Sequence, residues 1–322
     1  MEEKINSVIN EMSEILNVAQ LRMLQESLIK NFSDNVTQKE SISNREYVKL
    51  FLEAKRIEGC SERTIAYYKA TVDHFISVVT EPVRKITTEM IRSYLAMYQK
   101  RNNCGRVTVD NIRRNISSFF SWLEEEDYIL KSPMRRIHKI RTAKVVKQTI
   151  SDEGIEKLRD HCIVSRDLAI IDLLYSTGIR VGELVRLNRD DINFEQRECV
   201  VFGKGDKERR VYFDAKAKIH LQNYLHSRKD NNPALFVTLS APYNRLKISG
   251  VEIRLRELGR KVNIERVHPH KFRRTMATRA IDKGMPIEQV QKLLGHSQID
   301  TTMQYAIVNQ NNVKVSHQRY IA

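Results

Sequence analysis

Two segments in the middle of the sequence combine cationic side chains with turn residues. Arg180 follows Gly178, which predicts a helix end, and opens a further predicted helix with Glu183 one turn later. Lys204 lies between two glycines in a turn, where a long side chain can swing. A surface ion pair and an ordinary charged turn would explain these two segments if each stood alone.

Two segments near the end of the sequence add histidines, an arginine and a tyrosine. His270 and Arg273 are one helical turn apart on the same face of a predicted helix. The stretch GHSQIDTTMQY then places Tyr305 nine residues after His296. Capped helices with one half-buried aromatic ring would account for this stretch taken by itself.

Together these residues suit the attack of a tyrosine on a phosphodiester. Charge develops on the non-bridging phosphate oxygens, and guanidinium groups match that geometry with paired hydrogen bonds. A phenol, with an ordinary pKa near ~10, is both a nucleophile and a moderate leaving group, so the covalent step is reversible. A lysine on a mobile turn can protonate the departing oxygen as a general acid.

Other chemistries fit the sequence less well. The chain has no paired carboxylates, no serine elbow and no GxxxxGK[ST] phosphate-binding loop. His268 and His270 form a His-x-His pair, but no acid or cysteine nearby completes a set of metal ligands. We therefore expect no metal site and no cofactor.

In order and spacing, these residues resemble the tyrosine recombinases, which include the integrases of phages and other mobile genetic elements and the Xer-type resolvases. The resemblance rests on Arg180-x-x-Glu183, Lys204 in a hairpin turn, His270-x-x-Arg273, Leu293-Leu294-Gly295-His296 and Tyr305. It covers residues 45–322. Phe272 and Arg274 stand where family members often have leucine and histidine, and these departures leave the His-x-x-Arg face intact.

The resemblance implies a site-specific DNA recombinase that forms a 3′-phosphotyrosine intermediate without metal, nucleotide or external energy. It implies that His296 hydrogen-bonds the scissile phosphate and that Tyr305 attacks it. The implied partners are double-stranded recombination sites and three further copies of the chain, in a homotetramer on DNA that exchanges C-terminal tails. The catalytic residues implied are Arg180, Glu183, Lys204, His270, Arg273, His296 and Tyr305.

Two other functions remain open at this point. A type IB topoisomerase-like enzyme would use the same chemistry as a monomer to nick and reclose DNA, without choosing a sequence. A non-catalytic DNA-binding relative is less consistent with the sequence, because every catalytic position is filled.

The hydrophobic pattern predicts the elements that position these residues. The resemblance implies a mostly α catalytic domain with a small β-sheet (α+β) and a helical core-binding domain, closing on DNA as a C-shaped clamp. We expect the catalytic domain at 150–322. Its predicted elements are an N-cap at Ser151, helices at 165–177, 181–192, 215–228, 247–262, 270–283, 287–294 and 301–308, and a hairpin at 199–213. In that scheme, Gly295 ends one helix, Asp300 caps the next, and Tyr305 lies in the last.

The first half of the chain is predicted to be helical. Residues 41–137 carry four amphipathic stripes, at 45–59, 61–79, 88–102 and 107–127, and residues 138–149 form a basic linker. Residues 1–40 form a separate amphipathic segment. It holds one or two helices at 4–32 with a phase shift near Asn17, and a polar linker is expected at 31–44.

The charge of the chain favours a polyanionic partner. The net charge is +15. Residues 1–40 hold seven acids and four bases, a net charge of −3, which leaves +18 on the remainder. Nucleic acid is favoured over anionic lipid, since no strongly basic amphipathic helix with an aromatic face occurs. The expected DNA-contacting residues are Arg63, Lys69, Arg106, Arg113, Arg114, Lys139, Arg141 and Lys144.

The remaining composition is that of a globular protein. Hydrophobic residues make up 41% of the chain and charged residues 30%. No apolar run approaches the length of a membrane span, and the N-terminal residues lack the layout of a signal peptide. The four cysteines form no CxxC pair, which favours a reducing compartment. We therefore expect a cytoplasmic, nucleoid-associated protein with no membrane partner.

Overall fold

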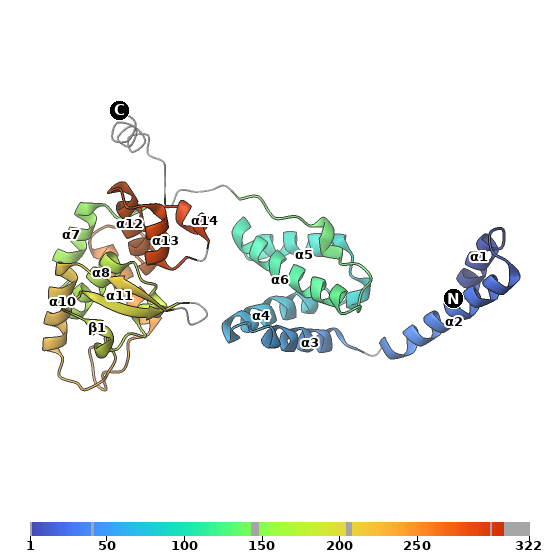
Figure 1. The fold of residues 1–322 in the computed structure, drawn as a ribbon, viewed down its shortest axis with the longest axis horizontal. Helices are drawn as coiled ribbons and strands as arrows, with labels where there is room; N and C mark the ends of the chain where they lie inside the picture. The colour runs from blue at the N-terminus through green and yellow to red at the C-terminus, as the bar shows by residue number, and fades with distance from the viewer. Residues whose placement is uncertain (1, 40–41, 143–147, 204–207, 297, 306–322) are drawn as a thin grey trace, which may run out of the picture. The chain divides into compact units, whose positions relative to one another are not determined.

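The computed structural model describes residues 2–39, 42–142, 148–203, 208–296 and 298–305 (Figure 1). The chain divides into two compact units, Met1–Val145 and Val146–Ala322. No helix in the described part of the chain is long and apolar enough to cross a membrane.

The chain begins with two helices, α1 (Glu2–Met12) and α2 (Val18–Lys39). The predicted break near Asn17 is confirmed, because Asn17 and Gln20 each bond the other's backbone amide at the start of α2. The polar linker predicted at 31–44 is wrong for residues 31–39, which continue α2. That stretch is polar but contains no glycine or proline to end a helix.

Four helices then pack around an aromatic core. They are α3 (Asn44–Ile57), α4 (Glu62–Val78), α5 (Thr88–Arg101) and α6 (Arg106–Glu125), with short 3-10 turns at Val83–Lys85 and Pro133–Arg136. The side chains of Ser61 and Thr87 each accept a backbone amide in the first turn of α4 and α5, from Thr64 and Met90 respectively. Phe51, Phe75 and Phe119 are fully buried where α3, α4 and α6 meet.

The second unit is built around helix α8 (Ser165–Thr177), which packs against α10 (Ala215–Ser227) and α12 (Pro269–Asp282). Helix α8 buries apolar side chains along most of its length, which fits its position between other helices. Helix α7 (Asp152–Asp160) precedes it and is capped by Ser151, as predicted.

A three-stranded antiparallel sheet lies in the same unit, formed by β1 (Ile192–Asn193), β2 (Glu198–Phe202) and β3 (Glu208–Tyr212) in that order. The predicted hairpin is confirmed, with Phe202 paired to Glu208 at the end where the chain connects the two strands. The predicted helix at 181–192 is too long, because α9 covers only Val181–Leu184. The guanidinium of Arg245 donates hydrogen bonds to the carbonyls of residues 185–187, each at 3.0 Å. These carbonyls are therefore not available to continue the helix.

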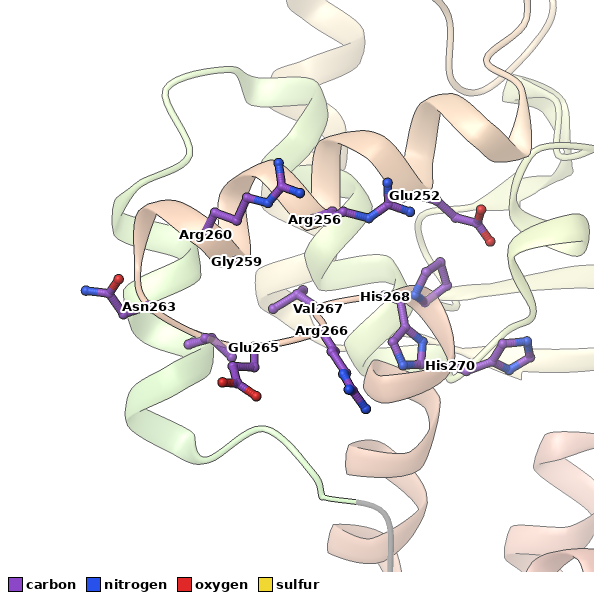
Figure 2. Close-up of a pocket in the computed structure, with 12 residues that line it drawn as sticks. Glu252, Arg256, Gly259, Arg260, Asn263, Glu265, Arg266, Val267, His268 and His270 are labelled. Atoms are coloured by element: carbon purple, nitrogen blue, oxygen red, sulfur yellow. The ribbon is translucent and has the colours of Figure 1, made fainter. Parts of the chain in front are cut away.

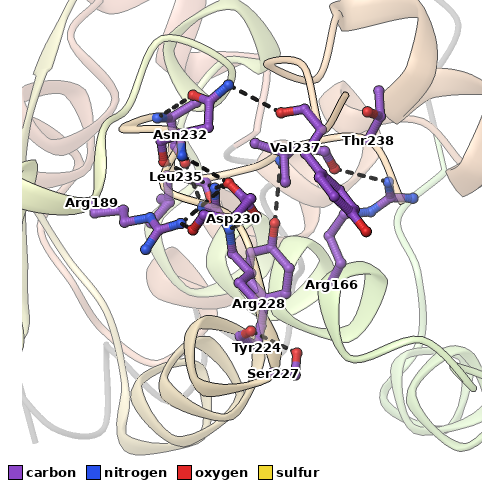
Figure 3. Close-up of polar contacts among 12 residues, drawn as sticks. Arg166, Arg189, Tyr224, Ser227, Arg228, Asp230, Asn232, Leu235, Val237 and Thr238 are labelled. Carbon is purple, nitrogen blue, oxygen red and sulfur yellow. Dashed lines mark hydrogen bonds and ion pairs between the residues drawn. The ribbon is translucent and has the colours of Figure 1, made fainter. Parts of the chain in front are cut away.

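A buried polar cluster holds the segment between α10 and α11 (Ile248–Lys261), as Figure 3 shows. Arg228 donates to Asp230 Oδ2 at 3.0 Å and to the carbonyl of Ala234 at 2.6 Å. These bonds from Arg228 lower the pKa of Asp230 to about 2. Arg166 of α8 donates to the carbonyl of Val237 at 3.1 Å. The segment is therefore fixed to the core, so that α11 starts from an anchored point.

Two short helices complete the described chain, α13 (Ile287–Leu294) and α14 (Ile299–Met303). Gly295 ends α13 in the left-handed conformation, with φ of 64°, as predicted. The predicted N-cap at Asp300 is wrong, because the cap position is Gln298. Tyr305 lies two residues beyond the end of α14, outside the helix in which it was expected.

Candidate functional site

The first part of the site lies where α8 ends and α9 begins. Gly178 ends α8 with φ of 62°, and Arg180 is the N-cap residue of α9. Glu183 Oε2 accepts the Arg180 backbone amide at 2.8 Å, and Oε1 accepts the Arg180 guanidinium at 2.9 Å. The buried Glu183 carboxylate therefore fixes both the backbone and the side chain of Arg180.

A second arginine that the sequence reasoning missed completes this ion pair. Arg209 of β3 binds both oxygens of Glu183, at 2.7 and 2.6 Å, and its side chain is 11% exposed. Burial raises the pKa of Glu183, but hydrogen bonds from Arg209 and from the Arg180 amide outweigh it and lower this pKa overall. The strand pattern held a signal, because Arg209 shares the inward face of β3 with the buried Val211.

Helix α12 contributes Arg273, which is almost completely buried. Its Nη1 donates to the carbonyl of Gly178, and its Nη2 donates to the carbonyl of Leu294, both at 2.6 Å. Burial and the nearby charge of Arg180 lower the pKa of Arg273 to about 10, so it remains a cation at neutral pH. Two arginines from separate helices thus face the same region.

His296 and Tyr305 lie at this same place, just after α13. The Nε2 atom of His296 is 3.0 Å from Nη2 of Arg273, and the Tyr305 ring stacks on the imidazole with centroids 6.0 Å apart. Burial, together with the charges of Arg273 and Arg180, lowers the pKa of His296 to about 4. The imidazole is therefore neutral at physiological pH.

The end of α13 requires a glycine for steric as well as conformational reasons. A Cβ atom on Gly295 would lie 2.9 Å from Cδ of Arg209, and its φ of 64° disfavours other residues. The carbonyl of Gly295 accepts from Arg180 Nη2 at 3.2 Å. The arginines can therefore approach this helix end closely only because residue 295 is a glycine.

His270 lies in the first turn of α12 and is exposed. Burial of its ring on one side, followed by the charges of Arg273 and Arg180, lowers the pKa of His270. His270 borders a groove of about 820 Å³ beside α11. Figure 2 shows the side chains that line it. Arg256, Arg260 and Arg266 line this groove, so it is rich in cations.

His268 and His270, the His-x-His pair that the sequence analysis weighed as metal ligands, lie side by side at the start of α12. Their ring centroids are 6.4 Å apart, and the ring planes meet at 61°. Within the described residues, no group of three histidine, cysteine or acidic side chains could hold a metal ion.

The remaining predicted residues are spread over the chain. Lys204 and Lys144 lie outside the described residues. The mostly buried Arg113 pairs with Asp110 at 2.8 Å. The other described candidates for DNA contact are exposed: Arg63, Lys69, Arg106, Arg114, Lys139 and Arg141. Of these, Lys69 pairs with Asp73, and Arg114 lies 3.6 Å from Asp110.

Comparison with known families matches both halves of the chain. The pattern of the Phage integrase family matches residues 142–312, and that of the Phage integrase, N-terminal SAM-like domain matches residues 48–130. Tyrosine recombinase XerA of Pyrococcus furiosus is 32% identical over 288 residues, covering 87% of this chain and 96% of its own. Tyrosine recombinase XerC of Leptospira interrogans is 31% identical over 287 residues, covering 85% and 92%.

Solved structures with the same fold include two integrases bound to DNA. The Tn1549 transposon integrase with a circular intermediate DNA aligns with a TM-score of 0.70 at 18% identity, covering 85% of this chain and 98% of its own. A lambda integrase dimer bound to a core site aligns with a TM-score of 0.69 at 16% identity, covering 88% and 85%. With these matches along both halves, the chain belongs to the phage integrase family, as a tyrosine site-specific recombinase that acts on DNA.

Proposed function

We propose that the protein exchanges DNA strands at specific sites through a covalent 3′-phosphotyrosine at Tyr305. The observation that carries the proposal is the gathering of Arg180, Arg273, His296 and the Tyr305 ring around the end of α13. Two integrases of the same fold have been solved with DNA bound, one with a circular intermediate DNA and one at a core site. We propose double-stranded recombination sites as the substrate, and hence a nucleoid-associated protein of the cytoplasm.

In the proposed step, the phenolic oxygen of Tyr305 attacks the scissile phosphorus, an O–P bond forms, and the bond to the 5′ oxygen breaks. Arg180 and Arg273 stabilise the charge that develops on the non-bridging oxygens. His270, kept neutral by its lowered pKa, accepts the phenolic proton. Lys204 gives a proton to the departing 5′ oxygen. The reverse sequence with a new 5′ hydroxyl rejoins the strand, so no energy source is consumed.

Replacing the nucleophile tests the proposal directly. We expect Tyr305→Phe to bind DNA but to lower formation of the covalent protein–DNA adduct by on the order of 10³-fold or more, because only the attacking oxygen is lost. Denaturing electrophoresis on nicked duplexes carrying candidate sites from beside the gene measures the adduct. Tyr212→Phe, at an exposed tyrosine of β3, is the matched control. An adduct that persists in Tyr305→Phe would assign the nucleophile to another residue.

The general acid is tested with a modified substrate. We expect Lys204→Ala to slow cleavage of ordinary DNA by roughly 10²- to 10⁴-fold, the usual contribution of a general acid. A 5′-bridging phosphorothiolate should be cleaved at nearly the wild-type rate, because sulfur leaves without a proton. Single-turnover cleavage of both substrates distinguishes the roles, and an equal loss on both would exclude Lys204 as the acid.

Arg209 is proposed to position Arg180 through Glu183. Lysine keeps the charge but has a single nitrogen and cannot make the planar two-nitrogen pair with the carboxylate, so we expect Arg209→Lys to slow adduct formation roughly 10- to 100-fold. Arg210→Lys is the control, because the adjacent Arg210 points outward with its side chain 65% exposed. Thermal melting of both variants checks folding. Equal rates for the two variants would leave Arg209 without this role.

We further propose a homotetramer on two DNA sites, in which the C-terminal tail of each protomer docks on a neighbour. The tail lies outside the described residues, but its sequence has only a few apolar anchors, Val313, Val315, Tyr320 and Ile321, too few for a core of its own. Exposed Ile299 and Met303 on α14 offer apolar surface near the point where the tail leaves the site.

Truncation after Val308 tests the tail. We expect the shortened protein to fold and to bind a single site, but to lose paired-site recombination by at least about tenfold, since avidity between protomers is lost. Gel filtration with DNA and a recombination assay, each run beside the full-length chain, measure assembly and activity. If assembly on DNA and recombination both persist in the truncated protein, the tail docks on its own protomer.

A further inference from the structure

Thr302 is the one side chain that helix α14 buries, and it lies three residues before Tyr305. Its exposed fraction is 0%. Its hydroxyl Oγ1 lies 2.8 Å from Nδ1 of His296. The helix that precedes the nucleophile is therefore joined by a hydrogen bond to the histidine on which the Tyr305 ring stacks.

The partners of His296 determine where its proton lies. A guanidinium can only donate, so Nε2 of His296 accepts the bond from Arg273 Nη2 at 3.0 Å. Because the imidazole is neutral, its single proton must be on Nδ1. Nδ1 therefore donates, and the hydroxyl of Thr302 accepts.

A bound phosphodiester reverses this requirement. Its oxygens only accept, so His296 must present a proton on Nε2 in order to bind one. Nδ1 of a neutral ring then becomes an acceptor. A hydroxyl group both donates and accepts by rotating its hydrogen, so Thr302 can satisfy either tautomer without moving its oxygen. Valine, which has the same shape, can satisfy neither.

We propose that Thr302 is a positioning residue, whose hydroxyl holds His296 in both proton arrangements and ties phosphate recognition to the docked state of α14. This inference rests on the proposed role of His296 at the scissile phosphate. If α14 leaves the site in one protomer, that protomer loses both the orientation of His296 and the nearby Tyr305. His296 and Tyr305 therefore engage the phosphate only together.

Three variants at neighbouring positions test the role of the hydroxyl. We expect Thr302→Val to slow adduct formation at saturating DNA by roughly 10- to 100-fold, the range for leaving a buried polar partner unsatisfied. Thr302→Ser keeps the hydroxyl and should stay within about threefold of the wild type. Thr301→Val, at the exposed adjacent threonine of α14, should change nothing.

A double-mutant cycle shows whether the effect passes through His296. In a His296→Ala background, whose own rate is lower, adding Thr302→Val should cost less than about twofold, because the partner is already gone. Melting curves of all variants establish that they fold. If Thr302→Val does not fold, Thr302→Cys, with a weaker donor of similar size, replaces it.

Each contrary outcome has a distinct meaning. Equal rates for Thr302→Val and Thr302→Ser would remove the hydroxyl from the mechanism. A full loss that persists in the His296→Ala background would show that Thr302 acts only by packing α14. Neither result bears on the nucleophile. By contrast, an adduct formed by Tyr305→Phe would overturn the proposed function and leave the Thr302–His296 bond untouched.

Discussion

The end of helix α13 is the point to which the rest of the site is fixed. Its last three carbonyls, of residues 293, 294 and 295, accept hydrogen bonds from Arg209, Arg273 and Arg180 respectively. These arginines come from β3, from α12 and from the start of α9. A helix C-terminus carries partial negative charge, so it attracts all three cations. One helix end thereby sets the mutual positions of elements far apart in the sequence.

This arrangement leaves an excess of positive charge. Three guanidinium groups contribute +3 and Glu183 contributes −1, which gives +2 while the imidazole of His296 remains neutral. Burial, and after it the repulsion between these cations, lowers the pKa values of Arg273 and His296. A phosphate entering the site relieves the repulsion, and more so as its oxygens gain charge during attack. In the proposed reaction, the charges that repel one another in the free protein therefore favour the transition state.

Sequence patterns could predict the local features of this site but not its long-range partners. Gly178 and Gly295 mark helix ends through a conformation that glycine favours, and both predictions are confirmed. The sequence does not distinguish Arg209 from the other basic residues of the hairpin, because its partner Glu183 is 26 positions earlier. Helix α9 is shorter than predicted because Arg245, some 60 residues later, donates hydrogen bonds to the carbonyls of the residues that follow the helix. Contacts of this kind depend on the tertiary fold, which periodicity does not encode.

The arginines and helix α14 are held in the site to different degrees, and this difference bears on the control of cleavage. The side chain of each arginine makes at least two hydrogen bonds within the protein, whereas α14 has five residues and buries only Thr302. A helix that short has little stability of its own, and one hydrogen bond contributes about 1 kcal/mol net. A change of 1.4 kcal/mol alters an equilibrium tenfold, so modest contacts from another segment are enough to dock or release α14. The arginines are thus the fixed part of the site and Tyr305 the adjustable part. With the roles proposed above, DNA is held by the arginines while cleavage depends on a further contact that docks α14.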